Sequence, residues 1–255
     1  MADEFKSHTS YREFSRSVME WRYIRSPDDE AFLRHVALTA KKRIEELPAS
    51  STLWRAQVGC EMLDAGFDHI EVPFPARLMK PPAHWRAIGQ SSEGRTNPTG
   101  IPFLYTATNE HIAISEVKPS PGHFVNSGTG TYEQGSSDCQ CDYRWGEDPQ
   151  HNSPQRTGGP ERELAVWRDI DRAFSQPVAM SAERADYAST QILAELFRKD
   201  GLDGIAYRSA FGTGHNIALF DADAADIVAC QLYRVAGTDV KYSASGSARA
   251  AKQGE

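Results

Sequence analysis

The sequence has few cysteines and no long hydrophobic run, which argues against a zinc-binding protein and against a membrane protein. Its four cysteines are Cys60, Cys139, Cys141 and Cys230, and no second Cys or His pair stands at zinc spacing from the central two. We therefore expect free thiols and no metal site. No apolar run approaches the roughly 18 residues of a membrane span, and the start of the chain has no basic and apolar regions of a signal peptide. The expectation is a cytoplasmic globular protein without membrane contact.

A surplus of basic residues is also missing, since 28 Lys and Arg stand against 35 Asp and Glu, a formal net charge of −7. Nonspecific duplex binding needs a basic face that displaces counterions. We therefore expect no direct nucleic-acid binding, although net charge leaves room for one local basic pocket. The 255 residues, 40% of them hydrophobic, suit one large domain with an appendage or two small ones.

Apolar periodicity predicts both helices and strands, which places the chain in the α+β class. Helices are expected at 10–21, 28–47, 109–117, 162–174 and 187–199, and strands at 53–58, 101–107, 205–209, 216–220 and 227–235. We divide the chain into a helical N-terminal extension at 1–50, a main domain at 51–236 and a flexible tail at 237–255. Residues 126–160 have too few apolar side chains for a core element, so we expect an irregular insertion there.

The densest local signal is the loop GRTNPTGIP at 94–102, which precedes a predicted buried strand. Its glycines and prolines favour an unusual backbone path, from which Arg95 could bind an anion through two hydrogen bonds. A surface turn with a solvated Arg95 is the alternative. Arg55 lies within an apolar strand, where a charge needs a partner or a pocket. Two arginines that converge on one cleft would suit a diphosphate.

Tyr105 ends the strand after this loop, and Glu116 lies on the next short helix. A tyrosine there is consistent with a core aromatic. A carboxylate among apolar neighbours is costly, which favours a functional role for Glu116. Ser209 and Asn216 flank a Gly-rich turn, and each could bind a ligand or cap a hairpin. Ser209 has no nucleophile elbow and no obvious His or Asp partner, which excludes a hydrolase triad.

Two other motifs carry no function in our interpretation. The turn Gly212-Thr213-Gly214 has neither the Lys nor the helix of a phosphate-binding loop. Glu161-Arg162-Glu163 could pass for the paired acids of an arginine-modifying transferase, but we interpret it as charge at a helix N-terminus.

Together these segments resemble the RES-domain family, named for its Arg, Glu and Ser. The matching stretches occur in family order: LWRAQ at 53–57, GRTNPTGIPFLY at 94–105, AISEVKP at 113–119, GLDGIAYRS at 201–209 and NIALF at 216–220. The helical N-terminus is similar to the extension of longer members. The resemblance implies an α+β fold like that of ADP-ribosyltransferases, with a split sheet and surrounding helices. Known RES toxins degrade NAD+ by hydrolysis or phosphorolysis.

The resemblance also implies a role for each matching residue. Its catalytic set comprises Glu116, Arg95, Tyr105 and Ser209, and its NAD+-binding set comprises Arg55, Arg95, Tyr105 and Ser209, with Asn216 as a weaker candidate. NAD+ would be the substrate rather than a cofactor, with inorganic phosphate as a second substrate in phosphorolysis. An antitoxin protein is an implied partner, and a homodimer is a further state to test.

The residue types fit this chemistry independently of the resemblance. Nicotinamide leaves as a neutral ring, so the reaction needs no strong general acid, only a stabilised ribosyl cation and a fixed diphosphate. Two alternatives remain open at this point. One is ADP-ribosyl transfer to a macromolecule, and the other is an inactive NAD+-binding or interaction module, which the composition of 126–160 favours.

Overall fold

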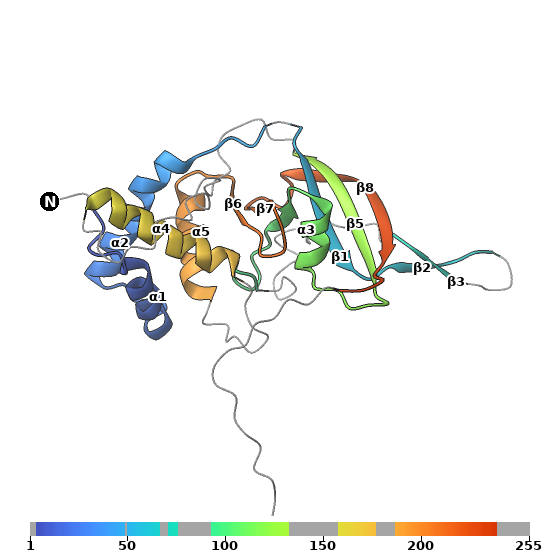
Figure 1. Cartoon of the computed structure of the whole chain (residues 1–255), viewed down its shortest axis with the longest axis horizontal. Helices are drawn as coiled ribbons and strands as arrows, with labels where there is room; N and C mark the ends of the chain where they lie inside the picture. Colours follow the sequence, from blue (N-terminus) through green and yellow to red (C-terminus); the bar gives the residue numbers. More distant parts are fainter. Residues whose placement is uncertain are drawn as a thin grey trace, which may run out of the picture.

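A six-stranded antiparallel sheet with helices on it forms the body of the molecule (Figure 1). The computed structural model describes residues 4–48, 50–66, 71–75, 93–132, 158–176 and 187–238. The helices are α1 (Ser10–Glu20), α2 (Pro27–Ala40), the 3₁₀ helix η1 (Lys41–Arg43), α3 (Glu110–Glu116), α4 (Gly159–Ser175) and α5 (Ala188–Lys199). The sheet strands are β1 (Thr52–Val58), β4 (Leu104–Ala107), β5 (Phe124–Tyr132), β6 (Gly204–Arg208), β7 (His215–Leu219) and β8 (Ala225–Arg234). The α+β prediction is confirmed.

The sheet consists of two three-stranded halves with a narrow junction. The strand order is β6-β7-β4-β1-β5-β8, and Trp54 on β1 opposite Ala107 on β4 is the one pair that joins the halves. Within the halves the ladders are longer, since every residue of β1 pairs with β5 and every residue of β4 pairs with β7. The sheet is therefore split between β4 and β1. A separate hairpin of β2 (Glu61–Asp64) and β3 (Glu71–Phe74) extends away from the body (Figure 1).

The expected irregular insertion at 126–160 is wrong at both ends. β5 covers 126–132 and α4 begins at Gly159, while 133–157 lies outside the described residues. Asn126 and Ser127 are almost completely buried despite their polar side chains. Backbone pairing with β1 and β8 holds this strand, and its small side chains allow α3 to pack against it. Hydropathy therefore did not predict β5, because backbone hydrogen bonds to the neighbouring strands, and not apolar side chains, hold this strand in the sheet.

The N-terminal extension and the main domain share one hydrophobic core. Phe14 of α1 stacks on Phe32 of α2 at a centroid distance of 4.6 Å. These rings belong to the same buried cluster as residues of α4 and α5, which are Val166, Trp167, Ile170, Phe174, Leu193 and Phe197. Figure 1 shows α1, α2, α4 and α5 as one helical group beside the β6 end of the sheet. The boundary at residue 50 therefore divides the sequence, but the segments on its two sides share one hydrophobic core.

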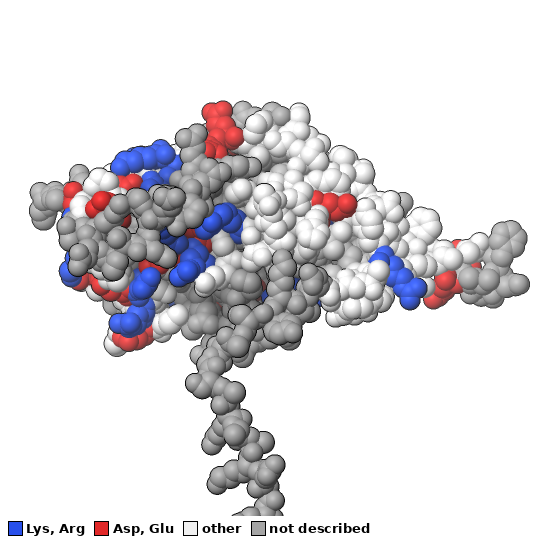
Figure 2. Space-filling view, viewed as in Figure 1, with Lys and Arg blue, Asp and Glu red and all other residues white. Residues whose placement is uncertain are grey.

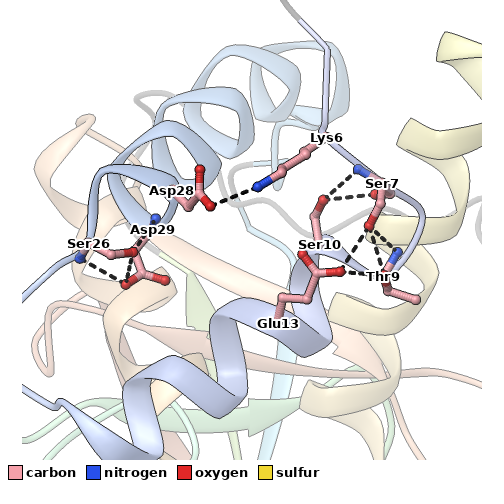
Figure 3. A network of polar contacts seen from close by, with 8 residues as sticks. All are labelled: Lys6, Ser7, Thr9, Ser10, Glu13, Ser26, Asp28 and Asp29. Atoms are coloured by element: carbon pink, nitrogen blue, oxygen red, sulfur yellow. Dashed lines mark hydrogen bonds and ion pairs between the residues drawn. The ribbon is translucent and has the colours of Figure 1, made fainter.

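Polar contacts gather at the N-terminal ends of the first two helices, and those at α2 cap the helix (Figure 3). Ser26 Oγ accepts from Asp29 N at 3.1 Å, and the Asp29 carboxylate accepts from Ser26 N at 3.0 Å, which forms a capping box. Lys6 pairs with Asp28 at 2.8 Å. A hollow of about 260 Å³ lies among these groups. Because the polar side chains around this hollow bind one another, we interpret it as a gap between the two helix N-termini and not as a ligand site.

The charged surface carries both signs. Figure 2 shows Lys and Arg interspersed with Asp and Glu over the helical group, whereas few charged side chains are visible on this face of the β1-β5-β8 half. In the parts of the chain that the structure describes, no helix has the length and apolarity to cross a membrane. Cys139, Cys141 and the expected tail from 239 lie outside the described residues, and Cys60 and Cys230 are free thiols.

Candidate active site

The carboxylate of Glu116 is held by two donors from the β6–β7 hairpin. Asn109 caps α3 by accepting from Ile112 N at 2.9 Å, and the helix ends at Glu116. Ser209 Oγ donates to Glu116 Oε1 at 3.0 Å, and Asn216 Nδ2 donates to the same oxygen at 2.5 Å. The second oxygen, Oε2, makes no hydrogen bond to any residue in the described segments, and the side chain is only half-buried. One carboxylate oxygen is therefore oriented by the protein, and the other is open to a ligand.

The hairpin turn lies against the start of α3, which sets the distance from Ser209 to Glu116. Thr108 N donates to His215 O at 2.9 Å, and Asn109 Nδ2 donates to Thr213 O at 3.2 Å. Gly214 adopts φ +143°, and a Cβ there would lie 2.7 Å from Ile112 Cδ1. Both the left-handed backbone and the close approach of α3 require glycine at this position.

Ser209 serves the turn as well as the carboxylate. Its Oγ accepts from Phe211 N at 3.1 Å while it donates to Glu116. The hairpin contact expected for this residue therefore occurs together with a hydrogen bond to Glu116, and ligand binding by Ser209 stays a prediction. Because its proton is directed at Glu116, Ser209 orients the carboxylate.

The hydroxyl of Tyr105 is buried in the loop that carries Arg95. It donates to Asn97 Oδ1 at 2.6 Å and shares a hydrogen bond of 2.5 Å with the Thr96 hydroxyl. A Cβ on Gly94 would meet this hydroxyl and lie 2.6 Å from Asn97 Oδ1, so glycine allows the loop to close over the phenol. Burial raises the pKa of Tyr105 above its ordinary value, although the hydrogen bonds from Thr96 and the charge of Arg95 oppose the effect. The hydroxyl thus anchors the loop.

Arg95 is fixed by its backbone and by its side chain. Thr190 Oγ1 on α5 donates to Arg95 O at 2.7 Å. The Arg95 guanidinium donates through Nη1 to the main-chain carbonyl of Phe174, in the last turn of α4. A helix C-terminus favours a cation, so this contact stabilises the Arg95 guanidinium against the end of α4. The interpretation of Arg95 as a solvated residue on a surface turn is wrong, because the side chain is half-buried and bonded.

Arg55 bridges the split in the sheet. Its Nη1 donates to the main-chain oxygen of Tyr105 at 2.8 Å, next to the Trp54–Ala107 pair. Its Nε is buried without a hydrogen-bond partner, and no carboxylate among the described residues pairs with it. Burial lowers the pKa of this guanidinium, and its interaction with Tyr105 acts in the opposite direction. A buried cation without a counter-charge within the described segments is a natural position for an anionic ligand.

Strand register places Tyr105 and Asn216 on one face of the sheet. Tyr105 on β4 is opposite Ala218 on β7, and Ala107 is opposite Asn216. Because side chains alternate along a strand, Tyr105 and Asn216 lie on the same face at diagonal positions, which are separated by about 7–8 Å. The group of Glu116, Ser209 and Asn216 therefore borders Tyr105 and the loop of Arg95. Arg55 follows Trp54, which is opposite Ala107, so it starts from the other face and reaches Tyr105 O through its Nη1 at the split.

Sequence reasoning missed the residues that support the loop from α5. Thr190 and Gln191 are almost completely buried, and the side-chain nitrogen of Gln191 lies 3.0 Å from Gly94 O and 3.1 Å from Asn97 O. The available signal was the polar run Ser189-Thr190-Gln191 at the start of an otherwise amphipathic helix. Such a run at a helix start also fits ordinary capping, which is why it did not stand out.

Comparison with known proteins gives a family and no individual relative. No curated protein matches the chain, and no solved structure matches it. The family model described as RES domain matches residues 52–243, which include all the candidate site residues. The match covers more than half of the chain, and the chain therefore belongs to the RES-domain family.

Proposed function

We propose that this protein cleaves the nicotinamide–ribose bond of NAD+, with water or inorganic phosphate as the second substrate. RES domains are associated with NAD+-acting, toxin-like enzymes at the level of the family. The observation that carries the proposal is the carboxylate of Glu116, whose Oε1 accepts from Ser209 and Asn216 while Oε2 has no partner within the described residues.

The proposed reaction requires little acid catalysis. The C1′–N bond breaks and its electron pair neutralises the pyridinium nitrogen of the departing nicotinamide. The ribosyl carbon then carries positive charge, which the oriented carboxylate of Glu116 stabilises. An oxygen of water or phosphate forms the new bond to C1′, which gives ADP-ribose or its 1″-phosphate. When water attacks, its proton passes to Glu116 or to solvent.

The two arginines supply the charge that the diphosphate of NAD+ needs. Arg55 contacts Tyr105 at its main-chain oxygen, and Arg95 lies near the hydroxyl of the same residue. A dinucleotide bound along Tyr105 would therefore have one guanidinium near the main-chain oxygen of that residue and the other near its hydroxyl. Arginine suits this role because its planar group binds phosphate oxygens in pairs.

The test is product analysis with purified full-length protein and NAD+, in the presence and absence of phosphate. Glu116→Gln keeps the size of the side chain and removes its charge, so we expect a loss on the order of 100-fold or more in turnover. Glu110→Gln is the matched control, because Glu110 lies on the same helix and contacts Tyr233 instead of the site. Equal activity of parent and Glu116→Gln would refute the site assignment.

Labelled NAD+ distinguishes the other activities. Label on a protein or nucleic acid would assign ADP-ribosyl transfer, and binding without turnover would assign an inactive NAD+-binding module. Family context adds an antitoxin protein as a partner and the cytoplasm as the location, and we propose both at that level. A second copy of the chain is a further proposed partner, which the oligomeric state in solution tests.

A further inference from the structure

Arg22 connects the N-terminal extension to the loop that carries Arg95. It lies in the segment between α1 and α2, and its Nη2 donates to Gln191 Oε1 at 3.0 Å. The same guanidinium nitrogen lies 3.9 Å from Glu93 Oε1. Gln191 is almost completely buried, and its side-chain nitrogen lies 3.0 Å from both Glu93 Oε1 and Gly94 O. Arg22 therefore pairs with Glu93, the residue before the loop, and reaches the loop itself through a buried amide.

The contact reinforces the orientation of the Gln191 amide. A glutamine side chain has one oxygen that accepts and one nitrogen that donates. Arg22 can only donate, so it favours the orientation in which Oε1 faces Arg22 and Nε2 faces the loop, which the acceptor oxygens of the loop also favour. In the opposite orientation the amide oxygen would face the oxygens of Glu93, Gly94 and Asn97 without a proton between them. Arg22 thus stabilises the one orientation that binds the loop.

The same loop holds the proposed ligand-binding charge. Arg95 lies between Gly94 and Thr96, and its carbonyl is fixed by Thr190, the neighbour of Gln191 on α5. A shift of the loop would move Arg95 away from Tyr105 and from the split in the sheet. Arg22 lies outside residues 52–243, so this support comes from a part of the chain beyond the family match.

We propose that Arg22 is a positioning residue for NAD+ binding, which acts through Gln191 to hold the Arg95 loop in its binding geometry. The identity of the ligand rests on the proposed function. Attachment of the extension itself does not depend on Arg22. Arg12 of α1 makes a two-point ion pair with Asp169 of α4, at 2.8 and 3.1 Å, and the shared core holds both helices.

The test compares Arg22→Ala with Arg12→Ala in the full chain. Both variants remove a guanidinium that links the extension to the main domain. Arg12 contacts Asp169 of α4, however, and involves neither Gln191 nor Glu93. We expect faster amide hydrogen exchange at residues 93–97 in Arg22→Ala and parent-like exchange there in Arg12→Ala. Unchanged exchange at 93–97 in Arg22→Ala, or the same increase in both variants, would overturn the proposal.

Calorimetry with NAD+ tests the consequence for binding. Because a hydrogen bond to a charged group is lost, Arg22→Ala should bind NAD+ about tenfold more weakly than the parent, and Arg12→Ala should bind like the parent. Arg22→Lys keeps one donor and should recover part of the affinity. In an Arg95→Ala background the Arg22→Ala change should cost nothing further, since its effect passes through Arg95. Additive losses in the double variant would contradict that route.

The two proposals fail in different ways. If the parent neither binds nor cleaves NAD+, the proposed function is wrong, and the exchange measurement alone decides whether Arg22 positions the loop. If the parent cleaves NAD+ and Arg22→Ala matches it in affinity and in exchange, the proposed function stands and the role of Arg22 is refuted.

Discussion

Asn216 and Glu116 are 100 residues apart in the chain, yet Asn216 Nδ2 lies 2.5 Å from Glu116 Oε1. This hydrogen bond joins the second residue of β7 to the last residue of α3, and Ser209 adds a second donor to the same oxygen. The carboxylate is therefore oriented from one side. Its position depends on a hairpin that follows it in sequence by more than a third of the chain.

Asn216→Asp should reduce turnover of NAD+ more than Asn216→Ala does. The aspartate replaces a donor by a carboxylate of nearly the same shape, and two adjacent carboxylates cannot both stay ionised. The alanine variant removes the donor without adding a charge. Steady-state kcat at neutral pH compares the two, and an aspartate variant as active as the alanine variant would contradict this account of the contact.

Tyr105→Phe should loosen the loop at 93–97. The change removes the hydroxyl that binds Thr96 and Asn97, and unpaired polar groups of this kind cost about 1–3 kcal/mol in the free energy of unfolding. Urea denaturation measures that loss, and NAD+ affinity should fall with it. Tyr233→Phe is the control, because Tyr233 is partly exposed and binds only Glu110 among the described residues, so it should leave stability nearly unchanged. Equal stabilities of the two variants would refute the anchoring role.

Arg55→Met should separate stability from binding. The buried guanidinium has no carboxylate partner within the described residues, and apolar replacements of buried charges are often neutral or stabilising. We expect an unfolding midpoint equal to or above that of the parent. Pyrophosphate should raise the midpoint of the parent and leave the variant unchanged, because a ligand stabilises only the state it binds. Protection of Arg55→Met by pyrophosphate would contradict the assignment of Arg55 to the anion.

His215→Gln should flatten the acid side of the stability profile. Burial lowers the pKa of His215 below 6.5, while the charge of Asp171 acts to raise it and that of Arg208 to lower it. The unfolded chain therefore takes up this proton at a higher pH than the folded protein does. The unfolding free energy falls as pH drops below 6.5, and the variant should not show this component. Urea titrations from roughly pH 7 to pH 5 measure the difference, and parallel curves would refute the role of His215.

Local sequence pattern predicted the elements whose apolar side chains face a core. The helices around Val166 and Leu193 follow helical spacing, and β7 is buried throughout, so their types were predictable. β5 was not, because Asn126, Ser127 and Gly128 are buried by backbone pairing and close packing rather than by hydropathy.

The candidate site was predictable as a set of residue types and not as a set of contacts. Glu116 stood out because a carboxylate among apolar neighbours is costly. That Tyr105 turns its hydroxyl into the 93–97 loop depends on the tertiary path of that loop. The contact of Arg22 with Gln191 spans 169 residues, and no local pattern reports such a pairing.

The junction between β4 and β1 has a consequence for how the sheet opens. Cooperative opening of native proteins follows continuous hydrogen-bonded units, and one residue pair is a weak connection between two such units. The β6-β7-β4 and β1-β5-β8 halves should therefore exchange their amides as two blocks, each with its own opening free energy. Arg55 donates across this junction to Tyr105 O, so an anion that draws the guanidinium away competes with the bond that ties the blocks together. If Arg55 binds the ligand as proposed, ligand occupancy will change how independently the two halves open.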